Sequence, residues 1–562
     1  MSTTAPAPST PAPAPARTSP AARRGSTLTG TWLLLRFMAR RDRVRLSVWA
    51  LSVVALWLYV VTAFSAVYST AADRQARAAL MSTPTSIMVT GPGYGLDDYT
   101  LGAMTANEMT LWVIVALAVM SIMQVVRHTR AEEESSRSEL IRAAVVGRHA
   151  PAVAAMLLVL AANVVIAALT VAVFAAGGLA VLDSVVLAAG VGLTAMVFAA
   201  VAVVTSQVTA HRRGASGMAI GVLGLAAVVR GAGDIQHLHG SALSWFSPIA
   251  WAQQTRAFVE VRAWPLLLSV VLTVLLLVVA AFLASHRDFG AGMIADRRGR
   301  ADARPTLRSP FAVAWRQQRT AIMWWALGTG LMWLASGTYL RDIGTMIEDM
   351  AEGNPAVAAI FGGADGAQTI VNSFVYIMLL FTALIAVGYG ISSLLRARTE
   401  ETQGRTEWVL ATPVSRRRWL GAQVAVAGIG AIVLVAVGTL GMAIGAYSVG
   451  VTDPGLATYA VAAAVYLPAV GLVLALATAI YAWAPRLTSL PWAFLVIAFV
   501  VGLFGEAFQL PDWIKGISPL WWVPQMPLEA FTWPPVLALT AITAALFTAA
   551  FTAFHRRDVP TV

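Results

Sequence analysis

Residues 130–148 read RAEEESSRSELIRAAVVGR, and residues 398–416 read RTEETQGRTEWVLATPVSR. Aligned without a gap, the two stretches share eight of nineteen residues, where chance would give roughly one or two. The shared pairs are Arg130/Arg398, Glu132/Glu400, Glu133/Glu401, Arg137/Arg405, Glu139/Glu407, Ala143/Ala411, Val146/Val414 and Arg148/Arg416. The match predicts that the chain is an internal duplication.

Other segments recur at nearly the same spacing. Arg40, Arg43 and Trp49 recur as Arg316, Arg319 and Trp325, SPIAW at 247–251 recurs as SPLWW at 518–522, and Arg287-Asp288 recurs as Arg557-Asp558. The predicted organisation is a disordered Pro/Ala-rich cytoplasmic tail (1–30), a first half (31–290), a cytoplasmic linker (291–312) and a second half (313–562).

The composition is that of a membrane protein. Hydrophobic residues make up 58% of the chain and the mean hydropathy is +0.72, above the roughly 45–50% apolar content of soluble domains. Twelve runs are long enough to cross a bilayer, at 46–64, 109–126, 150–176, 178–206, 216–232, 264–285, 321–339, 370–395, 419–447, 456–484, 488–508 and 534–554. The predicted fold is an all-α polytopic membrane protein with twelve transmembrane helices in two tandem six-helix repeats, parallel about an axis along the membrane normal.

The basic residues predict the topology. With the N-terminus inside, only seven of the 39 Lys and Arg residues lie on the outer side, as the positive-inside rule requires. Both termini are therefore expected to be cytoplasmic. This distribution also explains the net charge of +11 without a nucleic-acid partner.

The charged segment follows the second span of each half, and its pattern is typical of a short helix. Thr129 with Glu132 can form a capping box, and Glu133/Arg137 and Glu401/Arg405 have the spacing of ion pairs. A solvated loop that only sets topology would explain the arginines but not the glutamates, since acidic residues contribute little to topology. The alternative is a helix that docks a soluble partner at two pseudo-symmetric places.

The residues also limit the chemistry of the chain. Its single lysine, Lys515 in DWIKGIS, is not part of a Gly-Lys-Ser/Thr phosphate loop, so an ATP-driven protein of this kind would need a separate ATPase. The chain has no cysteine, and we expect no metal or other cofactor. The His237/His239 pair is interpreted as an exposed loop without a metal.

This layout resembles the permease of an ABC-2 type exporter. The features that carry the resemblance are the basic approach segment TGTWLLLRFMARRDRVR, the six spans, and the R-x-EE-x-x-x-R-x-E pattern after the second span. The fused form with VVRHTRAEEESSRSELIRAAVVGR is similar to actinobacterial permeases that export polyketide antibiotics, tetronasin-transport-like. The resemblance covers nearly the whole chain after residue 30.

The resemblance implies a bacterial plasma-membrane permease that is not itself an enzyme. It would export lipophilic compounds, and two copies of an ABC ATPase would hold ATP and Mg. Thr402 replaces Glu134 and Leu410 replaces Arg142 in the second copy, so the two docking sites can differ in strength. The implied coupling-helix residues are Arg130, Glu132, Glu133, Arg137, Glu139, Arg398, Glu400, Glu401, Arg405 and Glu407.

The resemblance further implies a central cavity between the second and fifth spans of the two halves. Candidate lining residues are Trp112, Met120, Met123, Phe374, Tyr376, Phe381, Phe494, Phe499 and Phe504, although such side chains also pack against lipid or neighbouring helices. Arg230 and Glu506 lie in apolar settings near the outer ends of these spans. Because a charge in such a setting usually finds a partner or an aqueous cavity, they are predicted to pair or to line an outer gate.

Three other classes remain as alternatives. An ion-driven twelve-span secondary drug transporter would need carboxylates within its spans, and no clear example is found in the middle of the runs. A membrane-embedded enzyme would need converging acid, base or metal ligands, but the outer-loop carboxylates are spread thinly. A non-transporting ABC-like component would display a larger outer domain than the loops at 65–108 and 340–369 can form.

Overall fold

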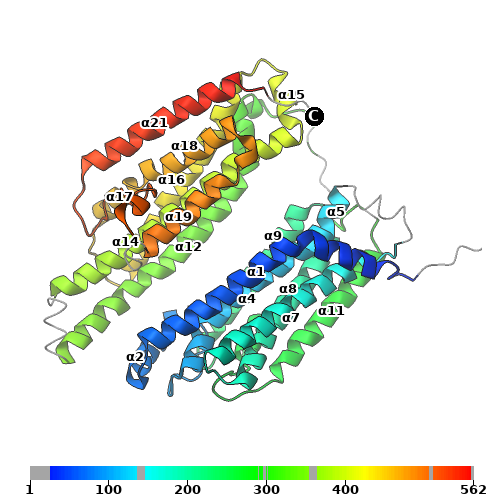
Figure 1. The fold of residues 1–562 in the computed structure, drawn as a ribbon, viewed down its shortest axis with the longest axis vertical. Coiled ribbons are helices and arrows are strands. Elements are labelled where there is room, and N and C mark those ends of the chain that lie inside the picture. Colours follow the sequence, from blue (N-terminus) through cyan, green and yellow to red (C-terminus); the bar gives the residue numbers. More distant parts are fainter. Residues whose placement is uncertain are drawn as a thin grey trace, which may run out of the picture. The chain divides into compact units, whose positions relative to one another are not determined.

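The computed structural model describes residues 26–135, 146–288, 290–294, 299, 301–353, 364–504 and 510–558 (Figure 1). Side chains are described within these ranges except at 84–85, 342–353, 364–367 and 503–504. In these ranges every regular element is a helix. The chain divides into two compact units, Met1–Arg298 and Gly299–Val562, which we call unit 1 and unit 2.

Unit 1 is built around α4 and α8, its most deeply buried long helices. Of the apolar window of α8, 78% is buried within the structure, against 11% for α11. The helices are α1 (Thr31–Val67), α2 (Ala71–Met81), α3 (Pro84–Val89), α4 (Leu101–His128), α5 (Arg130–Glu134), α7 (Ala150–Ala176), α8 (Val181–Val208), α9 (Arg212–Asp234), η1 (Ser244–Phe246), α10 (Pro248–Gln253) and α11 (Pro265–Ser285).

The basic approach segment at the start of unit 1 belongs to the first membrane helix. Residues 31–45 and the predicted span 46–64 form one continuous helix, α1, of 37 residues. It begins after Gly30, whose φ of 83° is a left-handed conformation that glycine adopts without strain. The helix α1 therefore runs from the basic approach segment into the packed helices of unit 1.

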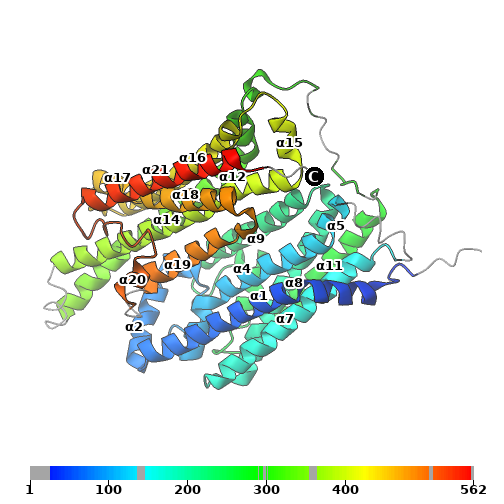
Figure 2. The same cartoon turned by 45° about the horizontal axis from the view of Figure 1, so that its top comes forward.

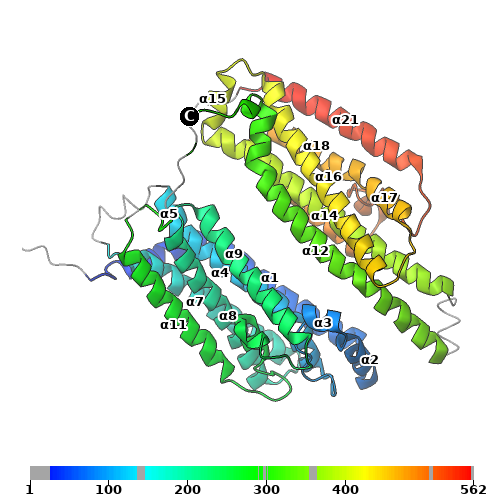
Figure 3. The same cartoon turned by 180° about the vertical axis from the view of Figure 1, so that it is seen from behind.

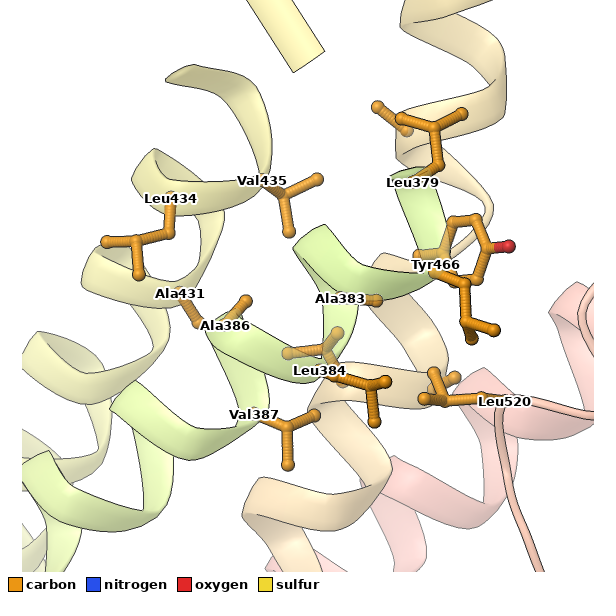
Figure 4. Close-up of a cluster of buried hydrophobic side chains, with 14 of the residues drawn as sticks. Leu379, Ala383, Leu384, Ala386, Val387, Ala431, Leu434, Val435, Tyr466 and Leu520 are labelled. Carbon is orange, nitrogen blue, oxygen red and sulfur yellow. The ribbon is translucent and has the colours of Figure 1, made fainter. Parts of the chain in front are cut away.

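Unit 2 follows a similar order of helices. Its core is formed where α14 packs between α16 and α18. Ala386 of α14 lies beside Ala431 of α16, and Leu379 and Leu384 lie on the side of Tyr466 (Figure 4). The elements are η2 (Pro305–Leu307), α12 (Pro310–Gly353), α14 (Ala364–Thr402), α15 (Arg405–Leu410), α16 (Arg416–Ser448), α17 (Leu456–Ala464), α18 (Leu467–Trp483), η3 (Pro485–Leu487), α19 (Leu490–Phe504), α20 (Asp512–Lys515) and α21 (Trp533–Arg556).

Glycines allow α12 and α16 to pack backbone against backbone. A Cβ atom added to Gly337, Gly441 or Gly445 would lie under 3.0 Å from main-chain atoms of the facing helix. Small residues four positions apart, as in Gly441-Met-Ala-Ile-Gly445, are a common device of helix association in membranes. The hydrophobic pattern of the sequence does not predict this contact.

Ten helices in the described ranges are long and apolar enough to cross a membrane. They match ten of the twelve predicted spans, with ends that differ by a few residues. The other two predicted spans are 321–339, which lies within α12, and 488–508, which overlaps the shorter apolar helix at Leu490–Gly502. The predicted span 456–484 is interrupted between α17 and α18. These helices make the chain a multi-pass membrane protein.

Candidate functional site

The charged segment of unit 1 begins as a helix, but Thr129 does not form the expected capping box with Glu132. The Thr129 hydroxyl instead donates to the main-chain oxygen of Val125, at 2.6 Å, and α5 has no side-chain cap. The predicted capping box is therefore wrong. Thr129 directly follows α4, and its hydroxyl donates to a main-chain oxygen in the last turn of α4 instead of capping α5. Arg137 and Glu139 lie outside the described residues.

Three charged residues form a buried network at this end of unit 1. Arg130 is 1% exposed and donates to Glu133 at 2.5 Å and to the main-chain oxygen of Gly290 at 2.7 Å. Arg287, which follows α11, donates to both carboxylate oxygens of Glu133, at 2.8 and 2.9 Å, and to Gln207 of α8 at 2.7 Å. This network, Arg130–Glu133–Arg287, ties the start of the charged segment to α8 and to the end of α11.

Unit 2 contains the corresponding network at the aligned positions. Glu401 accepts from Arg398 at 3.2 Å, from Arg557 after α21, and from the Tyr481 hydroxyl at 2.6 Å. Arg557 also donates to the main-chain oxygen of Tyr481 at 2.9 Å. We call the two networks, Arg130–Glu133–Arg287 and Arg398–Glu401–Arg557, the clasps.

A second contact is also present in both units. Arg148 donates to the main-chain oxygens of Ala284 and Arg287 at the end of α11. Its aligned partner, Arg416, donates to the main-chain oxygens of His555 and Arg557 at the end of α21. The sequence alignment thus corresponds to the same interactions in space, unit by unit.

Some predicted docking residues are therefore internal, whereas others face outward. Buried charges are stable only when paired, and Arg130, Glu133 and Glu401 have partners within their own units. Glu132 pairs with Arg41 of α1 at 2.6 Å, and Arg405 pairs with Glu400 at 3.3 Å rather than with Glu401. The predicted docking residues that are exposed in unit 2, Arg405 and Glu407, lie on α15. This helix lies at the same end of unit 2 as the C-terminal end of α14 (Figure 2).

The outward face of α15 carries an unusual pair of side chains. Trp408 is 80% exposed, and the neighbouring Glu407 is exposed as well. The helix ends at Leu410, before Pro413, as expected for a proline that cannot continue a helix. Trp408 was not among the predicted docking residues, although a tryptophan inside a charged segment is a signal that the sequence contains.

A polar contact between α1 and α4 was also not predicted from the sequence. Asp42 is 2% exposed and contacts His128 Nε2 at 2.5 Å and Arg127 at 3.1 Å. At the aligned position in unit 2, Gln318 contacts Ser393 and, at 3.4 Å, Gln423. In unit 2 the side chain of Gln318 thus meets neutral side chains, and Arg396, at the position aligned with His128, donates to the main-chain oxygen of Gln317 at 3.3 Å.

The candidate lining residues of the central cavity have different surroundings. Met120 is fully buried within unit 1, whereas Trp112 and Met123 are about half exposed. In unit 2, Phe381 and Phe499 make an edge contact at 6.2 Å, and Phe374, Tyr376 and Phe494 are partly buried. The side chain of Phe504 lies outside the described residues. Their role as a substrate wall remains a prediction.

A cavity of about 510 Å³ lies elsewhere, at the α5 end of unit 1, and none of the nine candidates borders it.

The outer end of unit 1 has its own ionic contacts. Arg230 donates to Asp234 at 3.2 Å and to the main-chain oxygen of Met88, so its charge is compensated within α9. Its predicted partner, Glu506, lies outside the described residues. Glu108 of α4 accepts from Arg77 at 2.8 and 3.2 Å and from the Tyr99 hydroxyl at 3.2 Å, and burial beside this carboxylate raises the pKa of Tyr99 above its usual value.

Comparison with known proteins places these features in a family. Residues 307–555 match the family model described as "Multidrug efflux system permease Rv1217c, C-terminal domain". The chain is 36% identical over 542 residues to the multidrug efflux system permease protein Rv1217c of Mycobacterium tuberculosis (strain ATCC 25618 / H37Rv), covering 95% of this chain and 96% of that protein. The chain therefore belongs to the family of multidrug efflux permeases represented by Rv1217c.

Proposed function

We propose that this chain is the membrane subunit of an ATP-driven ABC exporter in the bacterial plasma membrane, with both termini in the cytoplasm. It exports lipophilic compounds such as drugs or antibiotics and works with two copies of a separate ABC ATPase. In this proposal the two units are tandem six-span repeats, with 321–339 and 488–508 as the spans that complete twelve. The observation that carries the proposal is the repeated charged segment with the same clasp in each unit.

The clasps suggest how force passes from an ATPase to the membrane helices. In unit 1 the clasp joins α5, which directly follows α4, to Arg287 just after α11, and in unit 2 it joins the end of α14 to Arg557 just after α21. A push on α5, or on α15 through the end of α14, would therefore move two membrane helices together rather than bend one loop. Partner closure driven by ATP could in this way switch the transport path between inward and outward access.

The exposed face of α15 is the best place to test the partner. We expect Glu407→Arg combined with Trp408→Ala to weaken binding to the co-expressed ABC ATPase encoded beside the chain roughly thirtyfold, because one well-buried interface Trp contributes about 2 kcal/mol or more. The measurements are co-purification and substrate-stimulated ATP hydrolysis. The control is Trp513→Ala, an exposed tryptophan at the predicted outer side. Equal binding by the double variant and the parent would contradict docking through α15.

A proton-driven secondary drug transporter is the second candidate, because Glu108 is a buried carboxylate on a membrane helix. Its bidentate pair with Arg77 favours a structural role, since a proton relay needs a carboxylate that gains and loses its proton. Reconstituted vesicles distinguish the two candidates. Efflux that needs ATP and the ATPase, and that survives a protonophore, supports the ABC exporter, whereas efflux driven by a proton gradient alone supports the secondary transporter.

A further inference from the structure

The cavity in unit 1 has an apolar body and a charged end. Its floor is α8, and α1, α7 and α11 form its walls. Both α7 and α11 run beside α8 (Figure 3). The body is lined by Leu157 and Leu160 of α7, Leu193 and Met196 of α8, and Val274 and Leu277 of α11. Its volume of about 510 Å³ lies within the range of small-molecule sites.

The cavity is elongated along the helices. Its lining on α11 extends from Val270 to Ala284, which corresponds to about 20 Å along a helix axis. An apolar space of this size does not hold water well and is costly to leave empty. An alkyl chain lying parallel to α11 matches both its shape and its chemistry.

The charged end favours an anionic group. Among the rim residues, Glu132 pairs with Arg41, and Glu133 pairs with Arg287 and Arg130. Arg148 is exposed and donates only to main-chain oxygens, and among the described residues no carboxylate lies within ion-pair distance of it. Within the part of the chain that the structure describes, the positive charge of Arg148 at the mouth of the cavity therefore has no carboxylate partner.

Unit 2 carries larger side chains at several positions that line the cavity in unit 1. With the charged segments and the two Arg-Asp pairs aligned, Pro151, Ala281 and Ala284, which line the cavity, correspond to Trp419, Phe551 and Phe554. In unit 2 these aromatic side chains fill the space between the helices. Trp419 stacks on Phe554 at 5.7 Å, and Phe554 is fully buried. Small side chains keep the same region open in unit 1.

We propose that unit 1 binds a single-chain amphiphile with an anionic headgroup, its tail between α7, α8 and α11 and its headgroup at Arg148. The site lies at the α5 end, which the topology prediction places on the cytoplasmic side. Such a ligand is either an anionic membrane lipid or an amphiphilic compound entering from the inner leaflet. Binding does not depend on the ATP-driven export proposed above and is measured without any ATPase.

The absence of cysteine from the chain allows a direct test of this site. A single Leu193→Cys substitution places one thiol on the cavity floor, and its alkylation by N-ethylmaleimide is followed in phosphatidylcholine nanodiscs. We expect dodecyl phosphate to slow alkylation roughly fivefold once about four fifths of the sites are filled. Uncharged dodecyl maltoside at the same concentration is expected to slow it much less.

Matched variants assign the effect to the charge and to the cavity. Adding Arg148→Gln removes the preference for dodecyl phosphate, whereas adding Arg416→Gln, the aligned arginine of unit 2, retains it. Ala281→Phe with Ala284→Phe, which copies unit 2, abolishes protection by either probe while the protein stays monodisperse. Equal protection by both probes, or a preference that survives Arg148→Gln, overturns the proposal.

Nanodiscs containing phosphatidylglycerol identify the source of the ligand. If this lipid alone slows alkylation, the natural occupant is an anionic membrane lipid. If only added dodecyl phosphate slows it, the site takes amphiphiles that are not part of the bilayer. Both results support the anionic site, and the absence of protection in every condition rejects it.

Discussion

At the scale of single residues, the most informative side chains are charges that the fold buries. Arg130 and Glu401 sit in the most recognisable part of the sequence, yet they are almost fully buried. The repeat identified them as important, but a pattern of charges does not reveal whether they face a partner or each other. The arginines that complete the two clasps lie far away along the chain: Arg287 is more than 150 residues from Glu133, and Arg557 is more than 150 residues from Glu401. Only the folded structure brings them together.

The Glu401 clasp is expected to be a large contributor to stability. Glu401→Ala leaves Arg398, Arg557 and the Tyr481 hydroxyl without their shared acceptor, and removing one member of a buried ion pair typically costs about 3–5 kcal/mol. Thermal unfolding in detergent should show this as a marked loss. Glu400→Ala, which alters a more exposed pair, should change stability by less than about 0.5 kcal/mol. Similar losses for both variants would argue against the clasp.

His239 is expected to make stability depend on pH. Its ring stacks on Tyr94 at 4.7 Å, and partial burial and the nearby Arg256 lower the pKa of His239, against the opposite influence of Asp97. Because the folded state favours the neutral ring, this contribution is complete above the unfolded pKa of about 6.5 and is lost as the pH falls through the interval below it.

His239→Gln should therefore reduce the drop in melting temperature between neutral and mildly acidic pH. His237→Gln, at an exposed neighbouring position, is the control. An unchanged pH profile in the His239 variant would show that the stacked ring does not contribute.

At the scale of elements, hydrophobic runs located most of the membrane helices. Such runs are local properties of the sequence, so ten predicted spans lie in helices of the expected kind. Contacts between helices were harder to anticipate because they depend on which faces meet. The cavity at Ala281 and Ala284 and the contact at Gly441 both arise from small side chains, which also occur throughout lipid-facing helices.

The packing of α12 on α16 provides a test of these small residues. Gly441→Leu would push its side chain into the main chain of Gly330, and overpacking of this kind typically costs about 1–3 kcal/mol. Gly328→Leu is the matched control on α12, because a Cβ atom at Gly328 meets nothing within 4 Å. We expect faster thermal inactivation of the Gly441 variant alone. Equal inactivation would mean that the helices can separate without loss.

At the scale of the whole molecule, both units contain a clasp, but they bury its glutamate to different extents. The Glu133 side chain is 16% exposed, whereas that of Glu401 is 2% exposed and also accepts from Tyr481. Charge pairs lose strength as solvent reaches them. The order of helices was predictable from the repeat, but this inequality was not, because it depends on Tyr481 and on aromatic packing around Phe554.

We therefore expect Glu133→Ala to cost less stability than Glu401→Ala. A difference of about 1 kcal/mol or more would be consistent with the additional burial and hydrogen bond in unit 2. Chemical unfolding of the two variants, measured in the same detergent, gives the comparison. A larger loss for Glu133→Ala would reverse the assigned order of the clasps.

The contact between Asp42 and His128 has a consequence for any exchange of segments between the units. Its counterpart joins Gln318 to Ser393, so the same place holds a carboxylate in unit 1 and an amide in unit 2. An approach segment moved from unit 2 into unit 1 would put Gln318 where Asp42 now contacts Arg127 and His128, and these two basic side chains would lose their carboxylate. The two approach segments are therefore not interchangeable parts, and a chimera that carries the unit 2 segment in unit 1 is expected to fold poorly.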